Sequence, residues 1–377
     1  MRGHQANPWE LAPWQEPAIA ERFAVSYLRS RRGWFDTSAL SLESESAWTV
    51  RDLLPPGPLG DLAVRVPGDR YLRLAAHLRG AQIVHSQELG YWYSMQAARL
   101  KRRLGFKLAL TVWETLPFLD AYRNVRTRPY RERVLAETDL FLPATARARA
   151  ALLLEGVPPE RIRICPPGVD VGRFGAGRNA SQDGPPIIIS PARLVWEKGH
   201  QDVLRALALL RREGRHERAA NARLLIVGRG PEERRLRSYA QELGIGEHVE
   251  LRGFVPYEEM PAVYAGAACL VLASLPTTYW EEQFGMVLAE AMAAGLPIVA
   301  AGSGAIPEVT AGRARLFSPG DWVGLAAMLA EVLEAQTVPR EPVSAFSTTG
   351  AAEGIAAAYE ELLEQDVPRA PATEPRI

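Results

Sequence analysis

The sequence predicts an α/β protein made of two doubly wound domains, in which helices cover both faces of a parallel sheet. Three observations carry this prediction. The chain has 377 residues, which is the length of two ordinary domains. Short apolar runs rich in β-forming residues alternate with helical patterns along the whole chain. A stretch dense in glycine and proline, residues 166–186, interrupts this alternation near the middle and reads as a boundary between domains.

The first half of the chain alternates less regularly than the second. No apolar run precedes Phe23, where a doubly wound domain usually has its first buried strand. We therefore expect either a first domain that departs from the usual plan or a chain that starts inside a longer reading frame, and we favour the second. Apolar runs predict strands at Phe23–Leu28, Gln82–His85, Lys107–Trp113, Leu140–Pro143 and Arg161–Cys165. Helical spacing predicts helices at Arg70–Leu78, Tyr91–Leu104, Pro129–Glu137 and Arg147–Glu155.

The second half gives clearer patterns. Its strands are predicted at Ile187–Ser190, Arg223–Val227, Val249–Leu251, Ala268–Ala273, Ile298–Ala301 and Ala314–Phe317. Its helices are predicted at Gly199–Arg212, Glu232–Leu243, Glu258–Ala265, Gly285–Ala294, Trp322–Ala335 and Ala351–Leu363. We divide the chain into a first domain at 1–170, a linker at 171–185, a second domain at 186–345, a closing helix at 346–365 and a disordered tail at 366–377. If the chain starts inside a longer reading frame, the first domain lacks its first strand.

Composition excludes several classes of function. The 44 basic and 44 acidic residues balance, which argues against a strongly basic nucleic-acid binder and a disordered acidic scaffold. Cys165 and Cys269 lie 104 residues apart in apolar surroundings, as buried thiols in a reducing compartment do. No run of 18 apolar residues and no signal-peptide pattern occurs. We therefore expect a cytoplasmic protein without a nucleic-acid partner.

The most specific pattern is a pair of glutamates eight residues apart, Glu282 and Glu290, around the start of a predicted helix. Along a helix the pair spans roughly 12 Å, more than the about 5 to 9.5 Å between glycosidase carboxylates. This spacing suits an extended ligand held at both ends. The N–H groups near Gly285, Met286 and Val287 would lie at the positive helix end, where phosphate binds. Alternatively, Glu282 caps the helix and Glu290 is a solvated acid.

A second pattern places two cations, Arg193 and Lys198, in the loop after the first strand of the second domain. A guanidinium fork matches paired phosphate oxygens, and an ammonium acts as a point charge. Lys198 is the only lysine among the 20 basic residues after Asp170. The alternative is a solvated loop, but both patterns fall on strand-end loops of one sheet, where doubly wound domains bind ligands.

Three further turns follow strands of the same sheet. They are Gly228–Gly230, the turn of Gly253 to Val255, and the turn of Gly304 to Glu308. The first lacks the third glycine of a dinucleotide fingerprint, so a nicotinamide dehydrogenase is a poor alternative.

With these motifs the chain resembles a retaining nucleotide-sugar glycosyltransferase of the GT-B fold, in glycosyltransferase family 4 (glycosyl transferases group 1). The resemblance is close over Ile187–Leu333 and loose over the first domain. It implies two Rossmann-like domains whose parallel sheets face each other across a cleft. The first would be the acceptor side and the second would bind the donor, with the last helix crossing back to the first.

The resemblance also implies roles for individual residues. Arg193 and Lys198 would hold the donor diphosphate, and Glu282 would accept hydrogen bonds from the donor sugar, so these three form the catalytic set. Glu290 would accept hydrogen bonds from the ribose. The remaining donor contacts would come from Phe284, Gly285, Met286 and Val287 beside the diphosphate, and from Gly228, Gly230, Arg252 and Val255 beside the base.

The implied reaction moves a sugar from a nucleotide-diphosphate sugar to a glycan, a glycolipid or a small-molecule acceptor, as in polysaccharide biosynthesis. No Asp-x-Asp motif occurs, so we expect neither a divalent metal nor a cofactor, and catalysis by stabilisation of the departing diphosphate. In the mechanism proposed for the family, a donor phosphate oxygen takes the acceptor proton. Two alternatives stay open: a nucleotide-sugar epimerase of the same fold, and a non-catalytic nucleotide-sugar-binding relative.

Acceptor-side predictions rest on position alone. His85, Glu88, Trp113 and Glu114 follow or end predicted strands, and for His85 a structural role is the better interpretation. The chain up to Asp170 carries 24 basic and 18 acidic residues. Relatives with lipid acceptors dock on anionic leaflets through such surfaces. This predicts peripheral contact with the inner membrane face through two basic runs, one of Arg99, Lys101, Arg102, Arg103 and Lys107, the other of Arg123, Arg126, Arg128, Arg131 and Arg133.

Overall fold

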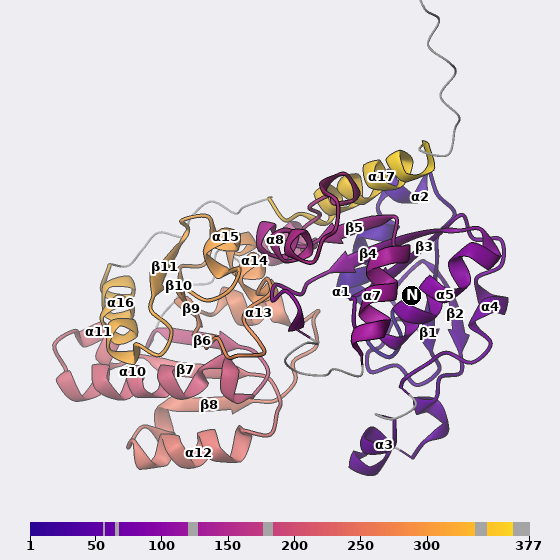
Figure 1. Ribbon diagram of the computed structural model, residues 1–377. Coiled ribbons are helices and arrows are strands. Elements are labelled where there is room, and N and C mark those ends of the chain that lie inside the picture. Colours follow the sequence, from indigo (N-terminus) through magenta and orange to yellow (C-terminus); the bar gives the residue numbers. More distant parts are fainter. Residues whose placement is uncertain (56, 65–67, 120–126, 176–183, 336–344, 365–377) are drawn as a thin grey trace, which may run out of the picture. The chain divides into compact units, whose positions relative to one another are not determined.

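The computed structural model describes the chain except residue 56 and residues 65–67, 120–126, 176–183, 336–344 and 365–377 (Figure 1). The predicted disordered tail, part of the predicted linker, and Arg123 and Arg126 therefore lie outside the described residues. Two compact units share the chain. The first consists of Met1–Ala144, Ala148–Gly168 and the described residues from Thr348 onward; the second consists of Thr145–Arg147 and Val169–Ser347.

The second unit is built on one parallel sheet of six strands in the order β11-β10-β9-β6-β7-β8. Because its four inner strands are buried on both faces, they appear in the sequence as short continuous apolar runs. The strands are β6 (Ile187–Pro191), β7 (Arg223–Val227), β8 (Val249–Arg252), β9 (Cys269–Leu272), β10 (Ile298–Ala301) and β11 (Ala314–Phe317).

The helices of the second unit cover its sheet, and all of them except α9, which precedes β6, follow a strand. Residues of α10, α12 and α16 form one core cluster with the strands, while Phe174 of α9 packs edge-on against Tyr264 of α13. The helices are α9 (Val171–Gly175), α10 (His200–Glu213), α11 (Glu217–Ala220), α12 (Glu233–Glu242), α13 (Met260–Ala265), α14 (Met286–Ala293), α15 (Ile306–Thr310) and α16 (Trp322–Glu334).

In the first unit the described strands form two parallel sheets and not one. One pairs β1 (Ser26–Ser30) with β2 (Glu43–Ala47), and the other has the order β3-β4-β5, with β3 (Ile83–Gln87), β4 (Lys107–Val112) and β5 (Leu140–Pro143). Its helices are α1 (Pro8–Leu11), α2 (Pro17–Ala20), α3 (Pro58–Ala63), α4 (Leu74–His77), α5 (Trp92–Leu104), α7 (Arg128–Glu137), α8 (Ala146–Leu154) and α17 (Thr348–Glu364).

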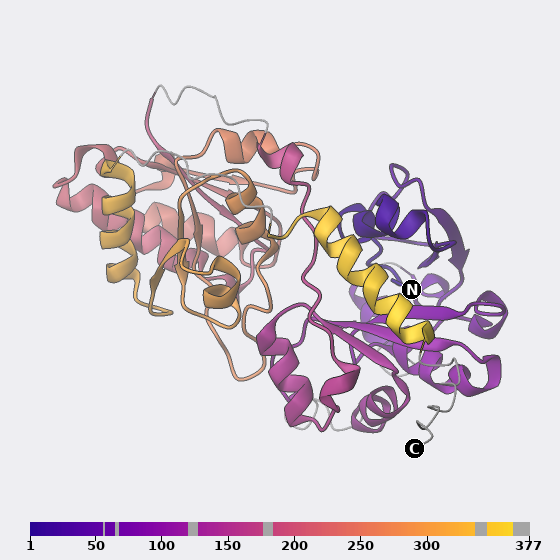
Figure 2. The same ribbon diagram turned by 90° about the horizontal axis from the view of Figure 1, so that it is seen from above.

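The last helix, α17, belongs to the first unit and lies beside α2 (Figure 1), and Figure 2 shows its whole length in yellow. Trp14 donates a hydrogen bond from Nε1 to the Tyr359 hydroxyl at 3.1 Å, and Arg22 pairs with Glu360 at 3.0 Å. Apolar residues of α17 share a core cluster with residues from the start of the chain.

Parallel sheets with helices in both units confirm the predicted fold class, but in the first half two local predictions were wrong and one strand was missed. Segment 161–165 is not a strand: only Ile162 forms a bridge, with Phe141, because prolines flank the segment on both sides. The predicted helix at Arg70–Leu78 shortens to α4, since Arg73 has a left-handed φ of 56° that stops it at its N-terminal end. Strand β2 was missed because its sequence, ESESA, is mostly exposed and has no apolar pattern.

Candidate active site

The loop after β6 is held in one shape by a buried histidine. His200 donates a hydrogen bond from Nε2 to the carbonyl of Arg193 at 3.2 Å, so its Nδ1 accepts one from the Ser190 hydroxyl at 3.0 Å. Burial lowers the pKa of His200 to about 4, so the ring is neutral near pH 7. Arg193 itself is exposed, and its guanidinium has no hydrogen bond or ion pair with another described residue. Its guanidinium is therefore available to an anion.

Lys198 and Glu282 form a partly buried ion pair at the carboxyl end of the sheet. Lys198 Nζ lies 2.7 Å from Glu282 Oε2, and the Ser274 hydroxyl donates to the same oxygen at 2.6 Å. The two side chains are 13% and 7% exposed. The ammonium also lies 4.6 Å from the centre of the Trp280 ring. An ammonium has three donors, so Lys198 can hold Glu282 and still bind a phosphate oxygen.

Glu290 is buried in helix α14 and is not the solvated acid of the alternative interpretation. The Tyr264 hydroxyl donates to its Oε2 at 2.6 Å. Burial raises the pKa of Glu290 to about 7, although the tyrosine hydrogen bond opposes this rise. The carboxyl group therefore changes charge near neutral pH and, when ionised, can accept hydrogen bonds from ligand hydroxyls.

This burial makes stability depend on pH. The unfolded-state pKa of Glu290 is near 4.5 and the folded-state value is about 7, so the folded state binds the proton more tightly. The stability that this proton binding contributes is complete below pH 4.5 and is lost as the pH rises to 7. Glutamine cannot bind this proton. Between pH 4.5 and 7 we therefore expect the unfolding free energy of the Glu290→Gln variant to fall by up to about 3 kcal/mol less than that of the unmodified protein. Urea unfolding at several pH values from about 4.5 to 8 measures the pH dependence of the unfolding free energy. The control is the Glu250→Gln variant, because Glu250 is exposed. An unchanged slope in Glu290→Gln would contradict the assignment.

The N-terminus of α14 presents main-chain donors. Gly285, at φ 79°, sets its start, and the N–H groups of Met286 and Val287 have no protein acceptor among the described residues. Phe284 faces inward: its ring is 2% exposed and packs edge-on against Phe346. Of the predicted diphosphate contacts, Met286 and Val287 thus offer donors, whereas Phe284 serves the core.

The glycines after β7 have a packing role. A Cβ on Gly228 would lie 2.0 Å from the Ala192 carbonyl oxygen, and one on Gly230 would lie 2.2 Å from that of Leu194. These glycines let the β7 turn pack directly against the β6 loop. Arg252, at the end of β8, is exposed and pairs with Glu250 at 2.8 Å, and Val255 follows, half-buried. Nothing in these contacts tests a role beside a nucleotide base.

Sequence reasoning missed the residues that hold the site together. Ser274 and Tyr264 each bond one of the two predicted glutamates, and His200 fixes the cationic loop. Ser303, in the loop after β10, keeps a buried hydroxyl without a partner among the described residues. Only the position of Ser274 and Ser303 after strands β9 and β10 could have indicated them.

In the first unit, the predicted acceptor-side residues have mixed environments. His85 is half-buried, and its ring nitrogens form hydrogen bonds with the Tyr359 hydroxyl at 2.6 Å and with Thr111 Oγ1 at 2.7 Å, which agrees with a structural role. Glu88 has a left-handed φ of 60°, and its Oε1 accepts the N–H of Trp113 at 2.7 Å. Burial raises the pKa of Glu88 to about 8.

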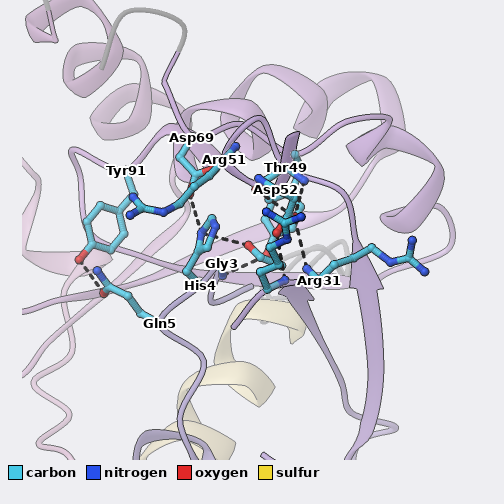
Figure 3. A network of polar contacts seen from close by, with 12 residues as sticks. Gly3, His4, Gln5, Arg31, Thr49, Arg51, Asp52, Asp69 and Tyr91 are labelled. Atoms are coloured by element: carbon cyan, nitrogen blue, oxygen red, sulfur yellow. Dashed lines mark hydrogen bonds and ion pairs between the residues drawn. The ribbon is translucent and has the colours of Figure 1, made fainter. Parts of the chain in front are cut away.

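A polar network that the sequence did not predict follows β1 and β2 (Figure 3). Asp52 accepts main-chain N–H groups of Arg31, Arg32 and Thr49 at 3.3, 2.9 and 2.8 Å. His4 contacts Asp69 at 2.7 Å. Because Asp52 is buried with its oxygens occupied by these groups, it fixes the two strand-end loops.

Four of the eight described residues in the two basic runs of the first unit form ion pairs. Ion pairs join Lys101 to Asp139, Arg102 to Glu137, Arg128 to Glu132 and Arg131 to Glu155. No described helix is long and apolar enough to cross a membrane. Within the described part of the chain, no group of three or more His, Cys, Asp or Glu side chains could hold a metal ion.

Comparisons with known proteins match both units. Residues 176–348 match the family model "Glycosyl transferases group 1", and residues 31–173 match "Glycosyltransferase Family 4". A D-inositol 3-phosphate glycosyltransferase of Corynebacterium jeikeium is 30% identical, over 74% of this chain and 72% of its own. The putative colanic acid biosynthesis glycosyltransferase WcaL of Salmonella typhimurium is 35% identical, over 54% of this chain and 50% of its own.

A solved structure agrees in fold. The crystal structure of Anabaena Alr3699/HepE in complex with UDP has a TM-score of 0.69 and 17% identity, and the match covers 96% of this chain and 98% of that one. The sequence matches to the first curated relatives, by contrast, span about half the length of those proteins.

Proposed function

The chain belongs to glycosyltransferase family 4, and from this premise we propose that it transfers a sugar from a nucleotide-diphosphate sugar, with retention of the anomeric configuration. The observation that carries the proposal is the cluster of Lys198, Glu282 and Ser274 at the carboxyl end of the second unit's sheet. The same unit presents the exposed guanidinium of Arg193. It also presents two N–H groups at the start of α14 that have no protein acceptor among the described residues.

These groups suit the parts of such a donor. Two cations and the α14 N–H groups complement a diphosphate, which is anionic in the middle of the ligand. Glu282, held by Lys198 and Ser274, keeps lone pairs for sugar hydroxyls, and Glu290 has the same capacity for a ribose. The HepE structure in complex with UDP shares this fold, which supports a nucleotide donor.

The chemistry follows from the charge that develops as the glycosidic bond breaks. The departing diphosphate gains negative charge, and Arg193 and Lys198 would stabilise it more in the transition state than in the ground state. In this proposal the acceptor hydroxyl bonds to the anomeric carbon on the same face from which the diphosphate leaves, and its proton passes to a donor phosphate oxygen. The protein therefore supplies neither a nucleophile nor a base. We also predict that the protein functions in surface polysaccharide or glycolipid synthesis. Peripheral contact with an anionic membrane is a further prediction.

Donor binding can be tested without knowing the acceptor. A ligand that binds only the folded state raises the melting temperature, by an amount set by its concentration relative to Kd. We expect one nucleoside diphosphate, among UDP, GDP, ADP and dTDP, to raise it by several degrees, and the corresponding monophosphate by less. A panel without any shift would contradict the proposed donor site.

Metal independence has its own test. We expect the same shift, and the same rate of donor turnover, in excess EDTA as in Mg²⁺, because the diphosphate charge is met by Arg193, Lys198 and main-chain donors. Inductively coupled plasma analysis of the purified protein serves as the control for retained metal. Loss of turnover in EDTA that Mg²⁺ restores would overturn this part of the proposal and leave the donor site intact.

A further inference from the structure

A tight turn in the loop after β9 places an indole ring next to the loop after β6. Thr277 and Trp280 form an antiparallel bridge, in which the N–H of Thr277 bonds to the Trp280 carbonyl at 2.7 Å. Within the turn, the N–H of Tyr279 bonds to the Thr277 hydroxyl at 3.3 Å. At the start of the loop, the N–H of Leu275 bonds to the Glu197 carbonyl at 2.8 Å. These bonds fix the point at which the Trp280 side chain leaves the main chain.

The Trp280 ring contacts the ammonium of Lys198. The Nζ atom lies over the ring, 4.6 Å from its centre, and 2.7 Å from Glu282 Oε2. A cation is attracted by the negative face of an aromatic ring, most strongly by tryptophan and where water is excluded. The Lys198 side chain is only 13% exposed, so little water surrounds the ammonium. The ring and the carboxylate therefore hold the ammonium at two places and restrict the directions in which its remaining donors point.

The surroundings of Trp280 differ from those of a ring that serves the core. Phe284, on the same loop, is 2% exposed and packs edge-on against Phe346. Trp280 is half-buried, and among the described residues its ring has no aromatic neighbour of this kind. The cation that its ring contacts is Lys198. The position of Trp280 is therefore explained better by the ammonium than by core packing.

We propose that Trp280 is a positioning residue for sugar transfer, which holds the Lys198 ammonium so that a free donor meets the departing diphosphate. This inference rests on the proposed function, in which Lys198 stabilises the charge that develops on the diphosphate. A cation that is already oriented needs no reorganisation as the charge grows, so the benefit is larger in the transition state than in the ground state. Trp280 therefore affects kcat more than KM, since Arg193 and the α14 N–H groups also bind the ground-state diphosphate.

Fluorinated tryptophans placed at position 280 by amber-codon suppression test this role. Each added fluorine withdraws electron density from the ring face and weakens its attraction for a cation, while the shape of the ring changes little. The substrate is a nucleotide sugar that carries the diphosphate found to raise the melting temperature. We expect kcat for its turnover to fall stepwise over one to three fluorines, by about tenfold in total, with KM changed less than about threefold. Trp280→Phe should keep part of the activity and Trp280→Leu none of this contribution.

A double-mutant cycle tests whether Trp280 acts through the lysine. In the Lys198→Met background, Trp280→Leu should lower kcat no further, because the cation that the ring orients is absent. Trp48→Leu is the matched control. In the first unit Arg31 lies 4.7 Å from the centre of the Trp48 ring, so this variant loses a comparable contact and should leave kcat unchanged.

Two results would overturn the inference. One is a kcat that does not depend on fluorination, and the other is a pair of losses that add in the cycle. Either result would make Trp280 a packing residue. Failure of the proposed function is recognised separately, because Lys198→Met itself would then leave donor turnover unchanged.

Discussion

Lys198→Met is expected to lower kcat/KM by at least about 100-fold, because it removes a cation from the departing diphosphate and leaves Glu282 without its ion-pair partner. Breaking a buried pair on one side leaves an uncompensated charge, so the variant should also lose about 3 kcal/mol of unfolding free energy. Glu282 keeps only the Ser274 hydroxyl as a bonded side-chain partner among the described residues. Steady-state kinetics with the identified donor, together with urea unfolding, measures both effects.

Two further variants separate binding from stability. Lys198→Met combined with Glu282→Gln removes the stranded charge, so stability should largely return while activity stays lost. Lys101→Met breaks a comparable ion pair with Asp139, at 2.6 Å in the first unit, and should lower stability without changing affinity for nucleoside diphosphates. Full nucleotide affinity in Lys198→Met, measured by calorimetry, would remove Lys198 from the donor site.

Gly199→Ala is expected to cost at least about 3 kcal/mol of unfolding free energy. Gly199 has φ 69° at the start of α10, and a Cβ there would lie 1.9 Å from the Ala273 carbonyl oxygen. That atom belongs to the main chain after β9, so it cannot move aside as a flexible side chain could. The loop carrying Arg193 and Lys198 would have to shift away from the residues that lead to Glu282, and donor affinity should fall as well.

The other end of the same helix supplies the control. Gly214, after α10, has a similar φ of 59°, but a Cβ at this position would meet no atom of another described segment within 4 Å. Gly214→Ala should therefore cost only the backbone strain, about 1 kcal/mol. Chemical denaturation of both variants tests the difference. Equal losses would show that the close approach to Ala273 does not constrain the loop.

The inner strands of the second unit, β6, β7, β9 and β10, could be predicted closely because they are buried on both faces. Arg223–Val227 and Ile298–Ala301 match the observed strands residue for residue, since such strands are continuous apolar runs in sequence. In the first unit, β2 lies at a sheet edge with four of its five residues exposed, so selection for apolar side chains is absent there. Local patterns cannot indicate a strand of this kind.

The candidate site likewise has residues that the sequence predicted and residues that it did not. Glu282, Glu290 and Lys198 were predicted from spacing and from their position after strands. Their partners Ser274 and Tyr264 come from elsewhere in the sequence and meet the glutamates only through tertiary packing. The burial of Glu290, which raises its pKa, also depends on the folded surroundings of α14 and not on its local sequence.

The placement of α17 in the first unit has a consequence for the order of folding. Trp14 and Tyr359 are 345 residues apart in sequence, yet they share a hydrogen bond. During synthesis the second unit, nearly all of it in Val169–Ser347, leaves the ribosome before α17 does. If it folds first, it shortens the effective loop that the first unit must close, which lowers the entropic cost of that closure. The first unit would then complete its core last, when α17 covers the apolar surface near α2.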